Sequence, residues 1–179
     1  MARTTLTGIA GFNNLKEPRG FKGEETKRTY AIDVILTPEE ADKFVAGNED
    51  VVNKLHAETI EREKAKGKKV LVRKPISTKD TPEGMVRITF KRKEEDKAPM
   101  VLGPDREPYV SFLKRGAKVK IAYDLVPYVM QGVFGVSLKL IAVQVLEEEL
   151  SAVDAAKLFE DDRPGLMQAT AKPAAKDLF

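Results

Sequence analysis

The sequence predicts a mainly β protein in which five strands form a small, strongly bent antiparallel sheet, with a helical insertion after the second strand. Five segments alternate apolar and polar residues with the period of two that half-buried strands require. Helix start and stop signals separate the second segment from the third. The chain has 179 residues, 42% of them hydrophobic, which suffices for one domain with a core. A small closed barrel suits such a sheet, and a β-sandwich is the alternative.

The first two predicted strands are joined by a polar segment. Thr4–Phe12 is rich in Thr and Gly and is expected to form a short, twisted strand. Pro and Gly residues interrupt Asn13–Thr26, which is expected to be a loop. In Lys27–Leu36 every second residue from Tyr30 onward is apolar or aromatic, which predicts a strand. Four of its residues are expected to face the core: Tyr30, Ile32, Val34 and Leu36.

Two helices are expected between the second and third strands. Thr37 can cap the first helix, Pro38 suits its first turn, and Glu40 completes a capping box. This helix is expected to end at Gly47, and Asn48 is expected to cap a second helix that continues to about residue 66. The apolar stripe of the second helix is thin, so we expect this helix on the outside of the barrel.

The remaining strands lie after residue 82, and the connection 68–82 is basic at its start and rich in turns at its end. In Met85–Lys93 the apolar residues are expected to face inward, and Pro99–Gly103 is expected to add a short strand. Ala117–Val126 and Val133–Leu146 form the best-defined pair, joined by a loop over residues 127–132. The alternation of the last strand changes phase near Ile141, which predicts a β-bulge.

The chain is expected to divide at residue 150. Residues 1–150 are predicted to form one domain, followed over 151–179 by a short helix and a mobile C-terminal tail. Basic residues recur in clusters up to Arg115, whereas the segment from Glu147 to Asp162 has seven acidic residues and one basic residue, Lys157. A basic body followed by an acidic segment indicates an anionic partner such as nucleic acid.

The composition excludes several classes of chemistry. Cysteine is absent and His56 is the one histidine, which excludes thiol nucleophiles, disulfides and most zinc sites. His56 lies in a charged, helical segment and is expected to be an ordinary side chain. No nucleotide-binding, zinc-protease or hydrolase motif occurs, so we expect no enzymatic activity and no metal or cofactor. No run approaches the ~20 apolar residues of a membrane helix, so an intracellular location without membrane contact is expected.

The residue pattern is better suited to binding a single strand, which requires cations along the phosphates and aromatic rings on which bases stack. Outward positions and strand ends supply the cations: Arg3, Lys27, Arg28, Arg87, Lys91, Arg92, Lys118 and Lys120. Tyr128 follows Pro127 at the end of a strand and is the best candidate for stacking, and Phe134 is a weaker one. Tyr30 and Tyr123 have the parity of core residues.

The last predicted strand pair combines a lysine-bearing strand, Gly116–Tyr128, which ends in Leu-Val-Pro-Tyr, with the return strand Gly135–Leu140. This pair resembles a known family, the single-stranded-DNA-binding proteins of T7-type bacteriophages. Arg28–Val34 also resembles the family's second strand, and the basic run Gly67–Lys69 follows a helical insertion at the corresponding place. The resemblance spans about residues 1–150, and its specific part is the last strand pair.

The resemblance implies a five-stranded oligonucleotide-binding (OB) barrel that coats and protects single-stranded DNA. It further implies a role in phage DNA replication, recombination and repair, with annealing of complementary strands, in the cytoplasm of the infected bacterium. Tyr128 matches a family aromatic that stacks on DNA, and Met130 stands where a second aromatic is expected. Arg3 matches a basic position of the family, and Lys27 with Arg28 lies near another.

Family members are homodimers, and their acidic C-terminal tail contacts the replicative polymerase and the helicase-primase. The aromatic end of that tail corresponds here to Asp177, Leu178 and Phe179. The family's tail also mimics DNA and shields the groove, but the last 17 residues here are not acidic, so autoinhibition is expected to be weaker. Two alternatives stay open from the sequence: an RNA-binding barrel of the same fold, and a non-DNA adaptor that recruits proteins through its tail.

Overall fold

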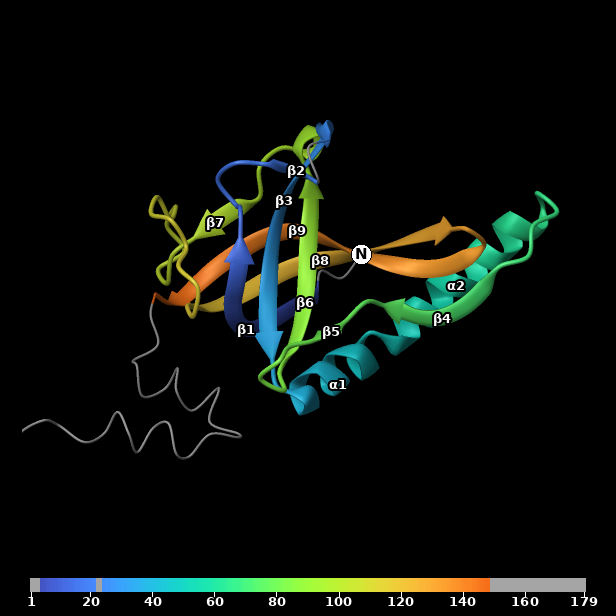
Figure 1. The fold of residues 1–179 in the computed structure, drawn as a ribbon, viewed down its shortest axis with the longest axis horizontal. Helices are drawn as coiled ribbons and strands as arrows, with labels where there is room; N and C mark the ends of the chain where they lie inside the picture. The colour runs from blue at the N-terminus through green and yellow to red at the C-terminus, as the bar shows by residue number, and fades with distance from the viewer. Residues whose placement is uncertain (1–3, 22–23, 149–179) are drawn as a thin grey trace, which may run out of the picture. The chain divides into compact units, whose positions relative to one another are not determined.

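The computed structural model describes residues 4–21 and 24–148. One pair of helices separates the first strands of the chain from the later ones (Figure 1). The helices are α1 (Pro38–Gly47) and α2 (Glu49–Lys64), with a short 3-10 turn at Glu94–Asp96. The strands are β1 (Thr4–Asn13), β2 (Arg19–Phe21), β3 (Glu24–Leu36), β4 (Leu71–Ile76), β5 (Lys79–Asp80), β6 (Val86–Lys93), β7 (Met100–Leu102), β8 (Lys118–Met130) and β9 (Val133–Glu147).

Five of the strands close into a barrel. Around the ring the order is β1, β3, β6, β9, β8 and back to β1, with β3 paired to β6. All neighbours are antiparallel except β6 and β9, which meet in parallel at Lys91 and Lys139. This order is that of the OB fold, in which one short parallel contact closes an otherwise antiparallel barrel. The predicted barrel with helices after its second strand is therefore confirmed, and the sandwich alternative was wrong.

Alternation along the strands fills the interior as expected. The inward residues of β3 and β6 are between 0% and 8% exposed, and Ile32, Val34, Ile88 and Phe90 are fully buried. The predicted bulge is present, because Ala122 pairs with Ala142 while Tyr123 pairs with Leu140, which leaves Ile141 as the extra residue. The bulge switches the inward set of β9, so both halves of this long strand bury their apolar residues.

The helix α1 covers one end of the barrel. Its capping box is formed as predicted: the Glu40 amide donates to the Thr37 hydroxyl at 3.2 Å, and the Thr37 amide donates to the Glu40 carboxylate at 2.9 Å. Phe44 of α1 packs on the rings of Phe90 and Tyr123 inside the barrel, with centroids 6.3 and 5.6 Å away. The helix therefore serves as the lid of the core at this end.

Asn48, between the two helices, does not cap α2 with its side chain as expected. It is 3% exposed, and its amide donates to the Phe44 carbonyl at 2.8 Å and to the Tyr123 hydroxyl at 3.0 Å. A buried amide and a buried phenol satisfy each other here, and removing either partner would leave a polar group without its hydrogen bond. The Asn48 side chain thus joins the helical pair to the barrel.

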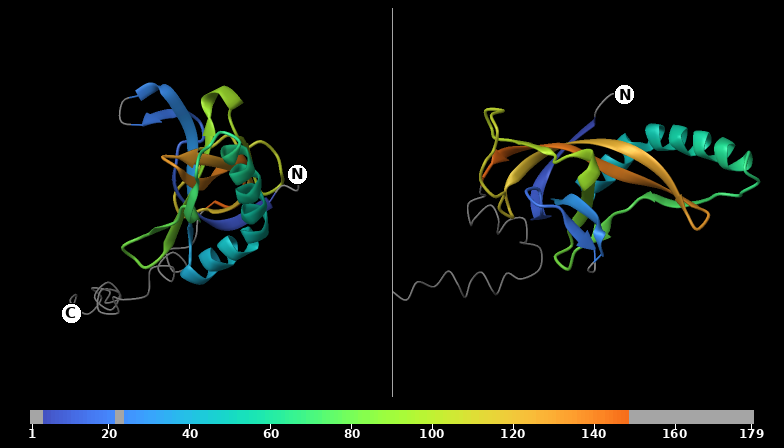
Figure 2. Two further views of the ribbon diagram at one scale, coloured as in Figure 1. Left: turned by 90° about the vertical axis from the view of Figure 1, so that its right-hand side faces the viewer. Right: turned by 90° about the horizontal axis from the view of Figure 1, so that it is seen from above.

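The pair β8–β9 is longer than predicted and forms an arm that projects from the barrel, with α2 and β4 beside it (Figures 1 and 2). The expected loop 127–132 is wrong except for its last two residues. Gln131 and Gly132 make the turn, with φ of 52° and 76°, the left-handed pair that a two-residue hairpin turn requires. Strand β4 lies in the connection 68–82, where no strand was predicted, and pairs in parallel with β9.

Two further short strands lie where loops were expected. Strand β2 pairs with β3 inside the segment 13–26, and β5 pairs with β6 inside 68–82. Both are edge strands of two or three residues, and so short a run has no alternation to reveal it. By contrast, the short strand that was expected within 99–103 is confirmed as β7.

Candidate nucleic-acid interface

The outward side of β3 and β6 forms one polar surface, called here the outer face. Antiparallel partners point to the same side of a sheet, so the pairing aligns Thr29 with Lys93 and Ala31 with Lys91 along this surface. In OB barrels the second and third strands, with the loops between the first two and the last two strands, contact oligonucleotides. Strands β3 and β6 are the second and third strands of this barrel.

A basic row crosses the outer face and leads to the arm. Lys91 of β6 is opposite Lys139 of β9, and Lys139 is opposite Asp124 of β8, so all three share one level of the barrel. Tyr128 lies four residues further along β8 on the same side, about 13 Å away at the usual strand rise. The row therefore connects Lys91 of the outer face, through Lys139 of β9, to the side of β8 that carries Tyr128.

Two cations, Lys93 of the outer face and Lys139 beside it on β9, are paired with exposed acids. Lys139 Nζ lies 3.2 Å from Asp96 Oδ2, and Lys93 Nζ lies 3.6 Å from Glu95 Oε1. Exposed pairs of this kind contribute only about 0–1 kcal/mol, so a phosphate can replace the carboxylate at little cost. Lys91 forms no ion pair with any residue in 4–21 or 24–148. The outer face therefore has the charge that a phosphate chain needs.

Tyr128 lies flat on the arm. It is opposite Gly135 in the hairpin, and a Cβ atom built on Gly135 would stand 2.4 Å from Tyr128 Cζ and 2.5 Å from its hydroxyl oxygen. Only a glycine leaves room for a ring that close to the strand backbone. One side of the ring thus covers the peptide chain, and Tyr128 remains 41% exposed. This is the geometry of a platform for a base.

The surroundings of Tyr128 are apolar and accessible. Val126 and Met130 lie on the same side of β8 and are 41% and 63% exposed. Leu71 of β4, opposite Val133, is 63% exposed beside them. Met130 occupies the place of the expected second ring, and its thioether is a soft apolar contact rather than a flat stacking surface. Tyr128 is therefore the one aromatic platform on this side of the arm among the residues that the structure describes.

Phe134 was wrong as a stacking residue. It faces α2 on the other side of the arm, is 2% exposed, and has its ring centroid 5.0 Å from that of His56. The sequence did not show that α2 covers this side of the arm, so it could not show that Phe134 is buried. His56 is half-buried in this contact, in line with the expectation of an ordinary side chain.

Arg92 was wrong as a DNA contact for a different reason. Its guanidinium donates to three backbone carbonyls: those of Asp96 (2.5 Å), Lys97 (2.7 Å) and Leu140 (3.1 Å). These bonds tie the turn after β6 to β9, so its donors serve the fold. Arg87 is half-buried and lies 3.9 Å from Asp33, which also accepts a 2.6 Å hydrogen bond from Thr89. Arg87 is therefore partly covered by other side chains of the outer face.

The remaining predicted cations divide between two surfaces. Lys27 and Arg28 are exposed at the start of β3 beside Lys93, and Arg28 lies 3.7 Å from Glu94. Lys118 shares a row with Arg87 through Ile9 and Ile35, whereas Lys120 lies opposite Thr7, over the β1–β8 pair and away from the outer face. Arg3 and the predicted partner contacts Asp177, Leu178 and Phe179 lie outside the described residues.

Sequence reasoning missed Gly135 and Lys139 as site residues. Lys139 has the outward parity of β9, so alternation could have found it. The close approach of Tyr128 to Gly135 depends on the hairpin register, which a single sequence does not display. The predicted division at residue 150 stays a prediction, since residues 149–179 are outside the described part of the chain.

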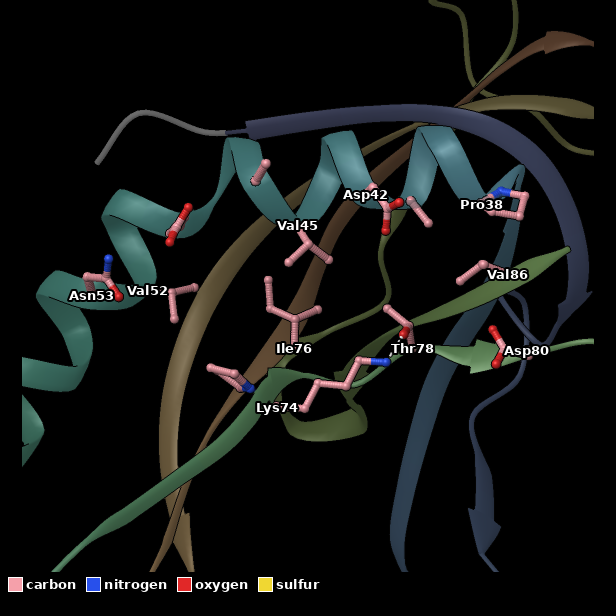
Figure 3. Close-up of a pocket in the computed structure, with 14 residues that line it drawn as sticks. Pro38, Asp42, Val45, Val52, Asn53, Lys74, Ile76, Thr78, Asp80 and Val86 are labelled. Atoms are coloured by element: carbon pink, nitrogen blue, oxygen red, sulfur yellow. Dashed lines mark hydrogen bonds between the residues drawn. The ribbon is translucent and has the colours of Figure 1, made fainter.

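A hollow of about 570 Å³ lies between the helices and β4–β5 (Figure 3). Val45 and Ile76 point into it, Lys74 donates a hydrogen bond to Thr78, and Asp42 and Asp80 stand at its rim. Three acids, Glu49 being the third, against one lysine make this hollow a poor place for a phosphate. The nucleic-acid candidate is therefore the outer face with the arm.

Within the described ranges, no helix has the length and apolar character to cross a membrane. No group of three or more His, Asp or Glu side chains within these ranges is arranged as a metal site.

Comparison with known proteins assigns the fold to a class: it is the OB barrel found in single-stranded-DNA-binding proteins of bacteriophages. It is similar to gp2.5, a single-stranded-DNA-binding protein encoded by bacteriophage T7 (TM-score 0.57, 19% identity, 86% of this chain and 97% of that chain). It is also similar to the single-stranded-DNA-binding protein of bacteriophage Enc34 in complex with DNA (TM-score 0.59, 16% identity, 83% and 88% of the two chains). No protein-family model and no curated protein matches the sequence.

Proposed function

We propose that this chain binds single-stranded DNA without sequence preference, along the outer face and the arm. The observation that carries the proposal is the ring of Tyr128, held flat over Gly135 at the end of a row that contains Lys139 and Lys91. Lysines follow phosphates as point charges, and an exposed ring accepts any base because every base has a π-face. The DNA-bound solved structure of similar fold supports the same ligand.

The proposal extends to the cellular role. The chain acts in phage DNA replication, recombination and repair, where it coats and protects single strands and promotes annealing in the cytoplasm of the infected bacterium. It works as a homodimer, is not an enzyme and uses no cofactor. Its terminal residues Asp177, Leu178 and Phe179 contact the phage DNA polymerase and helicase-primase. The likeness in fold to phage proteins that bind single-stranded DNA supports this role.

A titration tests the binding proposal. A labelled oligothymidine of about 16 nucleotides, the upper site size of one OB barrel, is titrated with the protein by fluorescence anisotropy. We expect tight binding whose logarithm falls linearly with the logarithm of salt, by about 0.7 per phosphate contacted. A duplex of equal length is the control and is expected to bind more weakly. Equal affinity for the duplex would overturn the proposal.

The same titration with an RNA oligomer separates the alternatives. Only RNA offers 2′-hydroxyl contacts, and the outer face holds no feature that requires them. Tighter binding of RNA would favour an RNA-binding barrel. Absence of binding to both would favour the adaptor, in which the tail rather than the barrel carries the function.

A further inference from the structure

An exposed phenylalanine near the end of β1 is flanked by two arginines. Phe12 is 42% exposed, and the guanidinium carbons of Arg19 and Arg115 lie 5.9 and 5.8 Å from its ring centroid. Phe12 and Arg19 come from β1 and β2, whereas Arg115 comes from the loop before β8 and is distant from both in sequence. The fold thus gathers two positive charges at one open ring.

A second ring of the same kind stands nearby. Phe112 is 75% exposed, with Lys16 Nζ 4.1 Å from its centroid. Both Arg19 and Lys16 line a crevice of about 130 Å³ that Phe112 also borders. We call Phe12, Arg19, Arg115, Lys16 and Phe112 the loop cluster.

The local backbone explains why Phe12 points outward. The register of β1 against β3 shifts between Ala10 and Asn13, where three steps on β1 correspond to two on β3. Such a bulge inserts an extra residue and turns a side chain that would otherwise face the core. The Cβ of a residue at Gly11 would stand 3.3 Å from Asp33 Cβ on the outward side of β3, so this part of β1 borders the outer face.

The loop cluster is joined to the outer face by strand pairing. Arg19 of β2 is opposite Thr29 of β3, and Thr29 is opposite Lys93 of β6. Neighbouring strands are about 4.8 Å apart, so crossing from β8 to β2 through β9, β6 and β3 covers about 19 Å. When the distance of about 13 Å along β8 is added, a DNA strand that leaves Tyr128 reaches Arg19 after about 30 Å. That length is on the order of ten nucleotides at a stacked rise of 3.4 Å.

The charge of the loop cluster is not neutralised within the described residues. No acidic side chain there forms an ion pair with Arg19, Arg115 or Lys16, although Glu17 lies at the rim of the crevice. An exposed cation–π contact contributes only about 0.5–1 kcal/mol, which is a small gain for holding two guanidiniums at one ring. An anion between them would relieve their mutual repulsion, and a flat ligand would cover the ring.

We infer that the loop cluster is a second contact for the same single strand, with an unstacked base on Phe12 and a phosphate between Arg19 and Arg115. The inference rests on the proposed function and adds where the strand runs after it leaves Tyr128 and the basic row. A protein partner that uses exposed phenylalanines is the competing occupant. If DNA occupies the cluster, changing the cluster weakens the binding of long DNA by the purified chain. If a protein partner occupies it, the same change leaves DNA binding as it was.

The test compares two oligothymidines, one of about 4 and one of about 16 nucleotides, because one OB barrel occupies between these numbers of nucleotides. Phe12→Ala is expected to weaken binding of the long oligomer about 5- to 150-fold, the effect of one lost stacking contact. The short oligomer cannot span both rings, so its affinity for the Tyr128 site is expected to stay unchanged. Val110→Ala, at an 81% exposed aliphatic position of the loop that carries Phe112 and Arg115, is the control.

A second variant tests the charges without touching a ring. Replacing Arg19 and Arg115 together by Gln is expected to reduce the salt slope of the long oligomer by about 0.7 for the shared phosphate. An oligomer carrying 5-iodouracil, crosslinked by light, is expected to label the peptide that contains Phe12. A thermal unfolding scan shows whether each variant keeps its fold.

The outcomes separate the two proposals. If wild type binds DNA and Tyr128→Ala weakens it while Phe12→Ala and the double arginine variant do not, the second contact is refuted and the proposed function stands. A loss that is equal for short and long oligomers would also refute it, since Phe12 would then belong to the first contact. If wild type does not bind either oligomer, the proposed function itself fails.

Discussion

At the scale of single residues, Tyr128 is the most informative position. Its ring is exposed on one side and supported by Gly135 on the other. Base–aromatic stacking contributes about 1–3 kcal/mol, so Tyr128→Ala is expected to weaken oligothymidine binding about 5- to 150-fold. Tyr128→Phe retains the ring and is expected to bind nearly as well as wild type. Anisotropy titration measures both, and equal losses for the two variants would speak against stacking.

Gly135 offers a test of the same platform from beneath. A methyl group there collides with the far end of the Tyr128 ring, which is free to swing away, so the fold survives but the ring is displaced. We expect Gly135→Ala to unfold at nearly the wild-type temperature and to lose most of the affinity that Tyr128→Ala loses. In the double variant with Tyr128→Ala the two losses are not additive, because both act on one ring. Additive losses would contradict this geometry.

Tyr123 predicts a dependence of stability on pH. Burial raises the pKa of Tyr123 above 10.0, and the hydrogen bonds with Asn48 and Thr4 oppose that rise in part. In the unfolded chain a tyrosine titrates near pH 10, so above about this pH the unfolded state loses its proton first. The stability that Tyr123 contributes is therefore complete below pH 10 and is lost as pH rises through its folded pKa.

The variant Tyr123→Phe isolates that contribution. It removes the titrating group and leaves the buried Asn48 amide without the bond to the hydroxyl, at a cost of about 1–3 kcal/mol at neutral pH. Urea unfolding at about pH 7 and at pH values above 10 is expected to show a smaller loss of stability with pH than in wild type. A variant that loses stability with pH as steeply as wild type would show that Tyr123 titrates normally.

At the scale of elements, the basic row across β6 and β9 determines how binding responds to salt. Each lysine that neutralises a phosphate contributes about 0.7 to the slope of log affinity against log salt. Replacing Lys91 and Lys139 together by Gln is expected to reduce the slope by about 1.4. Lys43 of α1, whose side chain is 75% exposed beside Glu39 and away from the barrel strands, is the matched control. An unchanged slope would remove the row from the interface.

The arm owes its position to three elements rather than to its own sequence. The β8–β9 hairpin is closed by a two-residue turn, paired along one edge by β4 and covered on one side by α2. A two-stranded hairpin alone is only marginally stable in water, so these neighbours are required to hold Tyr128 in place. The helical insertion thus supports the proposed site although no residue of α2 is part of it.

At the scale of the whole molecule, the described residues 4–21 and 24–148 share one hydrophobic core, which fills the barrel and reaches α1, α2 and β4. Every residue of the hydrophobic cluster lies between Ala10 and Val143. A chain shortened to residues 1–150 is therefore expected to unfold cooperatively at a temperature close to that of the full chain. It is also expected to bind oligothymidine at least as tightly, since the removed segment contains acidic residues. Calorimetry and the same titration measure both, and a shortened chain that does not fold would contradict the predicted division.

Much of the barrel was predictable from local patterns. Residues such as Ile88 and Val119 alternate with polar neighbours, and the change of phase at Ile141 located a bulge that the structure contains. The capping box at Thr37 and Glu40 was equally local, because its bonds join residues three apart. These signals depend on the nearest neighbours in the chain, which a sequence displays directly.

The site was predictable only in part, because parity says which side a residue faces but not what covers that side. Lys91 was found by its outward parity and Tyr128 by its place after Pro127 at a strand end, and both are exposed. Phe134 and Arg92 also seemed accessible, but α2 covers Phe134, and the guanidinium of Arg92 is used by backbone carbonyls. Contacts between elements decide these cases.

By itself the sequence determined the alternating strands, the helix start at Thr37 and the bulge at Ile141. Only the tertiary structure decided which outward residues meet: Lys91 beside Lys139, and Tyr128 on Gly135. The physical reason is that alternation and capping are interactions of adjacent residues. A binding surface instead forms where the register between distant strands aligns their side chains, and that register is a property of the closed barrel.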